Sequence, residues 1–142
     1  MKYVYPAKLT KDEEGFTATF RDVPEAITYG DTKKEALDNA ADALEEAIAT
    51  YILEKKPLPA RSKPRKGEHE VCLPLQTSFK AAIYQAAMSQ KVSNAELAKR
   101  LKIDEKEVPR ILDPHHETKL RRMEATLHAL GAKPRLDVDV AA

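Results

Sequence analysis

The first thirty residues alternate between apolar and polar positions. Tyr3, Tyr5, Ala7 and Leu9 define one alternating run, and Phe16, Ala18 and Phe20 define a second. A period of two predicts strands with one buried face. The polar segment Asp12-Glu13-Glu14-Gly15 lies between the runs, so we expect an antiparallel hairpin, with a third short strand at 26–29.

A helical period replaces this alternation after residue 31. Thr32-Lys33-Lys34-Glu35 has the form of a capping box, in which the Thr32 hydroxyl accepts from the amide of Glu35 and the carboxylate returns to the amide of Thr32. The apolar residues that follow recur at spacings of three and four and predict a helix over 32–54 packed on one face of the sheet. They are Leu37, Ala40, Ala41, Leu44, Ala47, Ile48, Tyr51 and Ile52.

Residues 55–67 contain three prolines and six basic residues, which predicts an exposed connection. Beyond it Val71, Leu73 and Leu75 alternate again, so we expect a fourth strand that returns to the sheet.

The rest of the chain follows helical periods. A helix is expected over 79–90, and Ser93-Asn94-Ala95-Glu96 is a second capping box that starts another. Asp104 caps a third helix over 105–112. Two short helices joined by a tight turn predict a helix-turn-helix unit that reads a DNA groove. A further helix ending near Leu130 and an alternating strand over 134–140 complete the pattern.

The pattern therefore predicts an α+β chain. Residues 1–77 form a βββαβ unit, and residues 78–142 form a unit of helices with a C-terminal β-strand. Lys102 stands at a turn position that favours glycine, because a left-handed backbone is strained by a β-carbon. Pro109 removes one backbone donor from the third helix, so we expect a kink or a shorter helix there.

Charge separates the two parts. The formal net charge is +1, but residues 1–60 carry −4 and residues 61–142 carry +5. This asymmetry predicts a basic partner for the first unit and a polyanion for the second. No apolar run would span a bilayer and the N-terminus lacks a signal peptide, so a cytoplasmic protein without membrane association is expected. The single cysteine, Cys72, excludes an internal disulfide, and we expect it to be a small buried residue.

A family resemblance adds to this picture. The chain resembles the N-terminal domain of HicB antitoxins, the partners of HicA toxins in type II toxin–antitoxin systems. The residues that match are Phe20, Asp22, Pro24, Thr28, Gly30, Thr32, Glu35 and Ala36. Arg21 and Glu25 depart from the pattern, since many members have Pro and Gly there. The resemblance implies a partial RNase H-like fold for residues 1–77 and binding of a small HicA-type toxin that cleaves mRNA.

The second unit resembles Cro/XRE helix-turn-helix proteins. The shared positions are Ala95, Leu97, Ala98, Leu101, Ile103, Val108 and Ile111. The resemblance implies that residues 78–142 bind operator DNA, with Asn94 on a phosphate and Glu105 and Lys106 on bases. Arg110 and Lys119 are expected to meet phosphates. The Ala129-Leu130-Gly131 ending before a strand is also recurrent in HicB antitoxins with this type of DNA-binding domain.

Contacts with the other partners are expected at two places. Asp22, Glu25 and Tyr29, with the outward side of helix 32–54, are the expected toxin-binding surface, because acidic groups mimic phosphates and steer a basic partner. Leu136, Val138 and Val140 share one face of the last strand. Pairing of this strand with that of a second copy would make a homodimer, from which a tetramer could be built.

Enzymatic interpretations have little support in the sequence. Asp12, Glu13, Glu14, Asp22 and Asp31 could be taken as carboxylates for two-metal cleavage, but each is explained by a solvated turn or a helix start. His115 and His116 lack a third ligand at metal spacing. We therefore expect no catalytic residues, no metal and no cofactor.

Two functions stay open. The first is an antitoxin that also represses its own operon. The second is a stand-alone dimeric transcriptional regulator whose N-terminal unit binds a small ligand or only oligomerises. A neighbouring gene for a small basic protein would favour the first. The operator sequence and the RNA preference of the toxin cannot be predicted from this chain.

Overall fold

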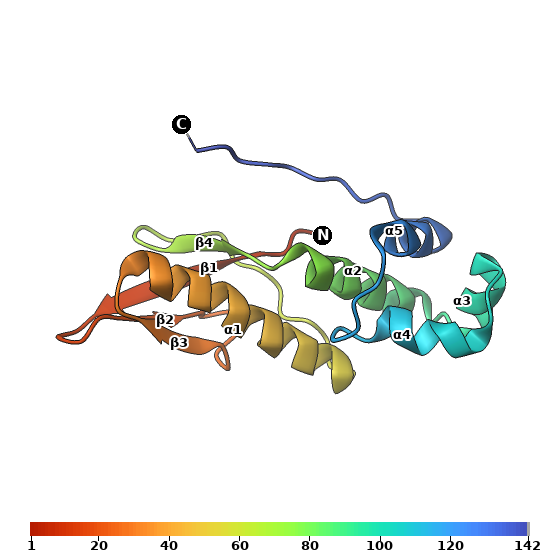
Figure 1. The fold of residues 1–142 in the computed structure, drawn as a ribbon, viewed down its shortest axis with the longest axis horizontal. Helices are drawn as coiled ribbons and strands as arrows, with labels where there is room; N and C mark the ends of the chain where they lie inside the picture. Colours follow the sequence, from red (N-terminus) through yellow and green to blue (C-terminus); the bar gives the residue numbers. More distant parts are fainter. Residues whose placement is uncertain (142) are drawn as a thin grey trace.

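A computed structural model describes residues 1–141. The fold is α+β: a four-stranded antiparallel sheet carries one long helix, and a group of shorter helices follows at one end (Figure 1).

The sheet has the order β3-β2-β1-β4. Strands β1 (Val4–Lys11) and β2 (Phe16–Thr19) form the predicted hairpin, and β3 (Ile27–Gly30) pairs with β2. Strand β4 (His69–Cys72) returns to pair with β1, as the alternation predicted. The predicted strand extended to Leu75, which instead begins a helix because Pro74 ends the extended segment and serves as its N-cap.

Helix α1 (Lys33–Leu53) covers one face of the sheet. The Thr32 hydroxyl accepts from the amide of Glu35 at 3.1 Å, as predicted, whereas the Glu35 carboxylate accepts from the amide of Asp31 rather than from that of Thr32. A β-carbon at Gly30 would lie 2.3 Å from the amide nitrogen of Ala36, so this glycine lets β3 approach the first turn of the helix. The helix buries a residue at nearly every turn: Ala36, Ala40, Leu44, Ile48 and Ile52.

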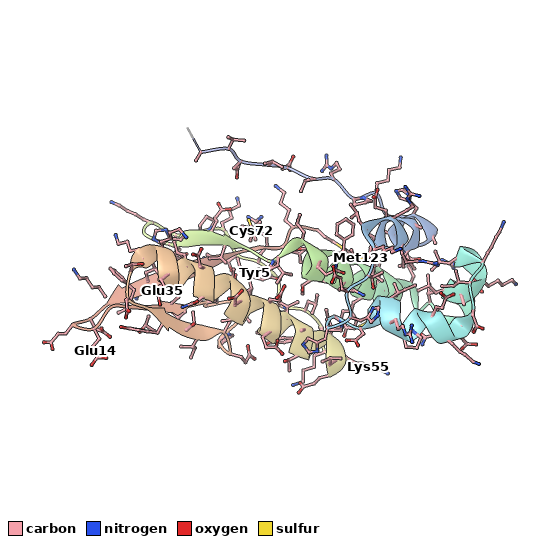
Figure 2. All side chains as sticks on the ribbon, viewed as in Figure 1. Tyr5, Glu14, Glu35, Lys55, Cys72 and Met123 are labelled. Atoms are coloured by element: carbon pink, nitrogen blue, oxygen red, sulfur yellow. The ribbon has the colours of Figure 1, made fainter. Side chains whose placement is uncertain are left out.

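The alternation of side chains along β4 determines whether Cys72 is buried or exposed. Val71 and Leu73 are buried against α1, so Cys72 between them faces the other side and is exposed (Figure 2). The expectation of a buried cysteine was wrong, because it ignored the period of the strand in which Cys72 lies.

The connection over 55–67 is largely exposed but its backbone is tied to the sheet. The Tyr5 hydroxyl donates to the carbonyl of Pro59 at 2.8 Å. Arg21 donates to the carbonyl of Lys63 and forms an ion pair with Glu68 at 3.0 Å. These contacts fix a segment that composition alone marked as a plain linker.

Four helices and one 3₁₀ turn follow the sheet. They are α2 (Leu75–Gln90), α3 (Asn94–Leu101), η1 (Glu105–Glu107), α4 (Val108–Leu112) and α5 (Leu120–Ala129). The helix predicted over 105–112 is divided into η1 and α4. Pro109 then lies in the first turn of α4, where a missing amide costs nothing.

Two apolar clusters build the interior, and α2 contributes to both. Ala81 and Tyr84 pack with the sheet and α1, whereas Ile83 and Ala86 pack with α3, α4 and α5. The two parts of the chain therefore share one helix.

The strand predicted over 134–140 is absent from the described chain, where residues 132–141 have no regular structure. Figure 1 shows an extended segment leaving α5. Leu136, Val138 and Val140 are 66%, 70% and 86% exposed. A strand requires a hydrogen-bonded neighbour, and no described residue provides one for this segment.

Candidate functional site

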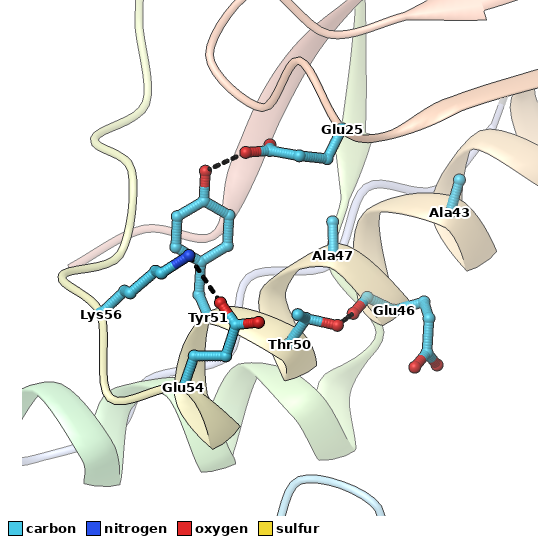
Figure 3. Close-up of a pocket in the computed structure, with 8 residues that line it drawn as sticks. All are labelled: Glu25, Ala43, Glu46, Ala47, Thr50, Tyr51, Glu54 and Lys56. Carbon is cyan, nitrogen blue, oxygen red and sulfur yellow. Dashed lines mark hydrogen bonds and ion pairs between the residues drawn. The ribbon is translucent and has the colours of Figure 1, made fainter.

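A groove lies between α1 and the loop that joins β2 to β3. Its volume is about 490 Å³. Ala43 and Ala47 of α1 lie along it, with Glu46 and Thr50 of the same helix and Glu54 at its C-cap, as Figure 3 shows. Glu25 faces them from the loop. The groove thus combines a floor of small side chains with carboxylates from two elements.

Hydrogen bonds fix the charges in this groove. The Tyr51 hydroxyl donates to the Glu25 carboxylate at 2.8 Å (Figure 3). This bond holds the pKa of Glu25 below its ordinary value and raises the pKa of Tyr51. Lys56 Nζ lies 2.6 Å from the Glu54 carboxylate. Three carboxylates and one ammonium leave the groove net negative at neutral pH.

Further acidic residues extend the charge along α1. Asp38, Asp42 and Glu46 follow one another at intervals of four on the exposed side of the helix. Lys34 pairs with Asp38 at 2.8 Å, and His115 Nε2 lies 3.2 Å from the Glu46 carboxylate. The outward side of the helix is therefore acidic, as the sequence indicated.

The structure separates the three residues expected to bind a partner protein. Glu25 lies in the groove. The Asp22 side chain is only 11% exposed, and its carboxylate accepts from the amide and hydroxyl of Ser62 at 2.7 and 2.6 Å. Asp22 thus holds the connection against the sheet.

Tyr29 lies elsewhere on the sheet. It belongs to the side of β3 that faces away from α1, because Ala18 and Thr28 form the pair beneath the helix. Its hydroxyl has one proton to donate and lies within hydrogen-bond distance of two acceptors, the Asp31 carboxylate at 2.9 Å and the carbonyl of Glu14. The bond with Asp31, more than partial burial, raises the pKa of Tyr29 to about 12.

Sequence patterns did not identify Tyr51 as a groove residue. Its position in the apolar stripe of α1 predicted burial, whereas its ring is half-buried and its hydroxyl reaches the loop. The sequence feature that could have identified it is a tyrosine at the edge of an apolar stripe, because the hydroxyl of a half-buried tyrosine stays available for a partner.

A second exposed surface is formed by the short helices. All five residues expected to contact nucleic acid are exposed: Asn94, Glu105, Lys106, Arg110 and Lys119. Asn94 begins α3, and Glu105 and Lys106 form the start of η1, where the Asp104 carboxylate accepts from the amide of Lys106 at 2.9 Å. Arg110 lies in α4, and Lys119 is the N-cap of α5.

Two local features explain how α3 connects to η1. Lys102 adopts a left-handed conformation with φ 55°, and the amide of Ile103 donates to the carbonyl of Ala98 at 3.1 Å. The lysine therefore makes the turn that glycine usually makes.

Neither a metal centre nor a membrane span is found in the described residues. No three His, Cys, Asp or Glu side chains among residues 1–141 lie together as metal ligands would. The same part of the chain holds no helix with the length and apolar character needed to cross a membrane.

Comparisons with known proteins agree with the resemblance found for the first unit of the chain. A family described as HicB-like antitoxin of bacterial toxin–antitoxin system matches residues 4–82. The chain is 39% identical to antitoxin HicB 2 of Photorhabdus laumondii over 127 residues, which cover 89% of this chain and 90% of that protein. It is 33% identical to antitoxin HicB of Escherichia coli K12 over 128 residues, which cover 89% and 93% of the two chains. Antitoxin HicB of Pseudomonas fluorescens is 34% identical over 121 residues, or 84% and 83%.

Proposed function

This chain belongs to the HicB-like antitoxin family, and on that basis we propose that it neutralises a HicA-type toxin and represses its own operon. It acts by binding and not by catalysis. Residues 1–77 bind the toxin, and residues 78–142 bind operator DNA.

The acidic groove beside α1 is the main observation in favour of toxin binding. A toxin that cleaves RNA must attract phosphates and therefore presents a basic surface. Glu25, Glu46 and Glu54 offer it carboxylates over a floor of alanines that permits close approach. Opposite potentials on the two partners accelerate association and fix their register.

The remaining expected contacts have different roles in this proposal. Tyr29 is partly exposed and can meet the toxin from the outer face of the sheet. Asp22 acts through its bonds to Ser62, which hold the connection and with it the shape of the loop that presents Glu25.

A binding measurement on the full chain tests the groove. We expect Glu25→Gln with Glu46→Gln to lower the affinity for the co-encoded toxin at least about tenfold and to weaken its salt dependence, because the pairs they form are screened by salt. Glu70→Gln with Glu117→Gln removes the same charge from exposed sites outside the groove and is the matched control. Equal losses from both double variants would show that only net charge matters.

For DNA, we propose that the segment from η1 to α4 enters the major groove. Glu105 and Lys106 come first in this segment and are exposed. In this proposal Glu105 accepts a hydrogen bond from cytosine N4, and Lys106 donates to guanine O6 and N7. Asn94, Arg110 and Lys119 are exposed as well, and in this proposal they contact phosphates. If the chain binds the DNA upstream of its gene but retains no toxin, the stand-alone regulator is the correct function.

We propose further that DNA is bound by a homodimer joined through residues 134–140. Leu136, Val138 and Val140 alternate with Asp137 and Asp139, and all three apolar side chains are exposed in the single chain. Pairing with the same segment of a second copy would bury these apolar side chains. Two recognition helices would then be available for a palindromic site.

A further inference from the structure

Helix α2 contains a lysine that no predicted function uses. Lys80 has no exposed surface. Its ammonium donates to the carbonyls of Arg110 and Ile111 at 3.0 and 2.8 Å and to the Thr118 hydroxyl at 2.6 Å. The three protons of the ammonium therefore have three acceptors, which is the condition under which a charge can be kept inside a protein.

The acceptors belong to the segment that forms the proposed DNA surface. Arg110 and Ile111 lie in the last turn of α4, where carbonyls have no partner within the helix. Thr118 immediately precedes the N-cap of α5, which is Lys119. One ammonium thus ties the end of α4 to the start of α5.

A second side chain of α2 holds the same segment. Gln76 donates to the carbonyl of Thr118 at 3.2 Å and accepts from its amide at 3.1 Å. Gln76 and Lys80 are four residues apart and share one face of the helix. This face of α2 therefore holds Thr118, in the turn before α5, by both the backbone and the side chain of Thr118.

The rest of α2 is fixed to the sheet and α1. The Tyr84 hydroxyl donates to the carbonyl of Lys56 at 2.7 Å, and Thr77 donates to the Glu45 carboxylate at 2.9 Å. Ala81 and Tyr84 are buried in the cluster beneath α1. Whatever Lys80 holds is consequently held relative to the whole first part of the chain.

The geometry points to Lys80 as a positioning residue for operator recognition, which fixes α4 and the turn at Lys119 so that both reach one DNA segment in register. The inference depends on the proposed DNA binding. An apolar side chain of the same length would fill the space but would make none of the three directed bonds. Hydrogen bonds to bases form only within a narrow range of donor–acceptor distances. If α4 is held less firmly, its side chains lose contacts with the bases even where the chain stays folded.

The test compares the full-length variant Lys80→Met with the wild type. The probes are a DNA duplex from upstream of the chain's own gene, an unrelated duplex of the same length, and the co-encoded toxin. We expect a loss of about tenfold or more in affinity for the upstream duplex, a smaller loss for the unrelated duplex, and unchanged toxin affinity. Thr118→Val removes one acceptor only, and we expect a smaller change in the same direction.

Two controls separate positioning from general destabilisation. Leu44→Ala weakens the packing of α1 on the sheet, away from α4, and we expect this variant to retain operator affinity. Lys91→Met removes the same charge from the exposed end of α2. Operator affinity equal to that of the wild type in a folded Lys80→Met, or an equal loss in Leu44→Ala, overturns the inference.

Hydrogen exchange provides a readout that does not need DNA. Lys80→Met is expected to accelerate amide exchange in residues 108–119 and to leave α1 unchanged. If the wild type binds no upstream duplex, the proposed repressor function fails, and a role of Lys80 in operator recognition fails with it. The exchange pattern then shows only whether Lys80 holds residues 108–119 in place. Uniform acceleration across the chain would contradict a positioning role.

Discussion

Within residues 1–141, three helices end at a lysine in a left-handed conformation. Lys55, Lys91 and Lys102 have φ of 56°, 55° and 55°. The amide that follows each lysine donates back to the helix, to the carbonyls of Tyr51, Ala87 and Ala98 at 2.9, 3.0 and 3.1 Å. Each site is a Schellman turn in which glycine would normally be found.

Replacing these lysines by glycine should stabilise the protein. An L-residue in this conformation is strained by about 1–2 kcal/mol, and glycine removes that strain. Glycine also gives the unfolded chain more freedom, which offsets about 0.5–1 kcal/mol of the stabilisation. The net effect is about 0.5–1 kcal/mol for each site. The three sites lie in separate turns and share no partner, so their effects should add to about 2 kcal/mol. The midpoint of thermal unfolding should rise by about 4–8 °C.

Urea denaturation followed by far-ultraviolet circular dichroism measures this change. The matched control replaces the same three lysines by alanine, which removes the same charges but keeps the β-carbon. We expect the alanine variant to be no more stable than the wild type. The reasoning is refuted if the glycine variant is no more stable than the alanine variant.

Three further outcomes are expected. Burial lowers the pKa of Lys80 to about 8, although the negative charge of Asp113 acts in the opposite direction and raises it. Between about pH 8 and 10 the unfolded chain therefore binds more protons than the folded chain does. The free energy of unfolding should rise with pH in that window by at most about 1.4 kcal/mol per unit, and Lys80→Met should lack the rise. Lys106→Ala should relax base preference, whereas Arg110→Ala and Lys119→Ala should weaken binding to all sequences and flatten its salt dependence; equal loss of specificity from all three would contradict the assignment. Deleting residues 134–142 should halve the mass measured by light scattering, and an unchanged dimer with full operator affinity would refute the role of this segment.

Local signals predicted the sheet and the long helix because they depend on near neighbours in the chain. The period of two in β1 and β2 and the cap at Thr32 are fixed by residues a few positions apart. The same signals identified Lys102 and Pro109 as conflicts. The structure resolves both locally, with a left-handed lysine at one site and a helix that starts near the proline at the other.

Contacts between distant segments could not be predicted in this way. Asp22 resembled a surface acid of a loop, yet it binds Ser62, forty residues away. Lys80 lay in a helix whose pattern said only that some face is buried, and its three acceptors come from residues 110–118. Side-chain partners of this kind depend on how elements meet, which periodicity does not specify.

The sharing of α2 determines how the two binding surfaces should be studied. The family match extends to residue 82, beyond the start of α2 at Leu75. A fragment ending at residue 77 would lack Ala81 and Tyr84, which are buried beneath α1, and the bond from Tyr84 to the carbonyl of Lys56. Its loss of toxin binding would then report a damaged core rather than a missing contact. Point substitutions in the full chain, which leave α2 in place, are therefore the measurements that separate the toxin surface from the DNA surface.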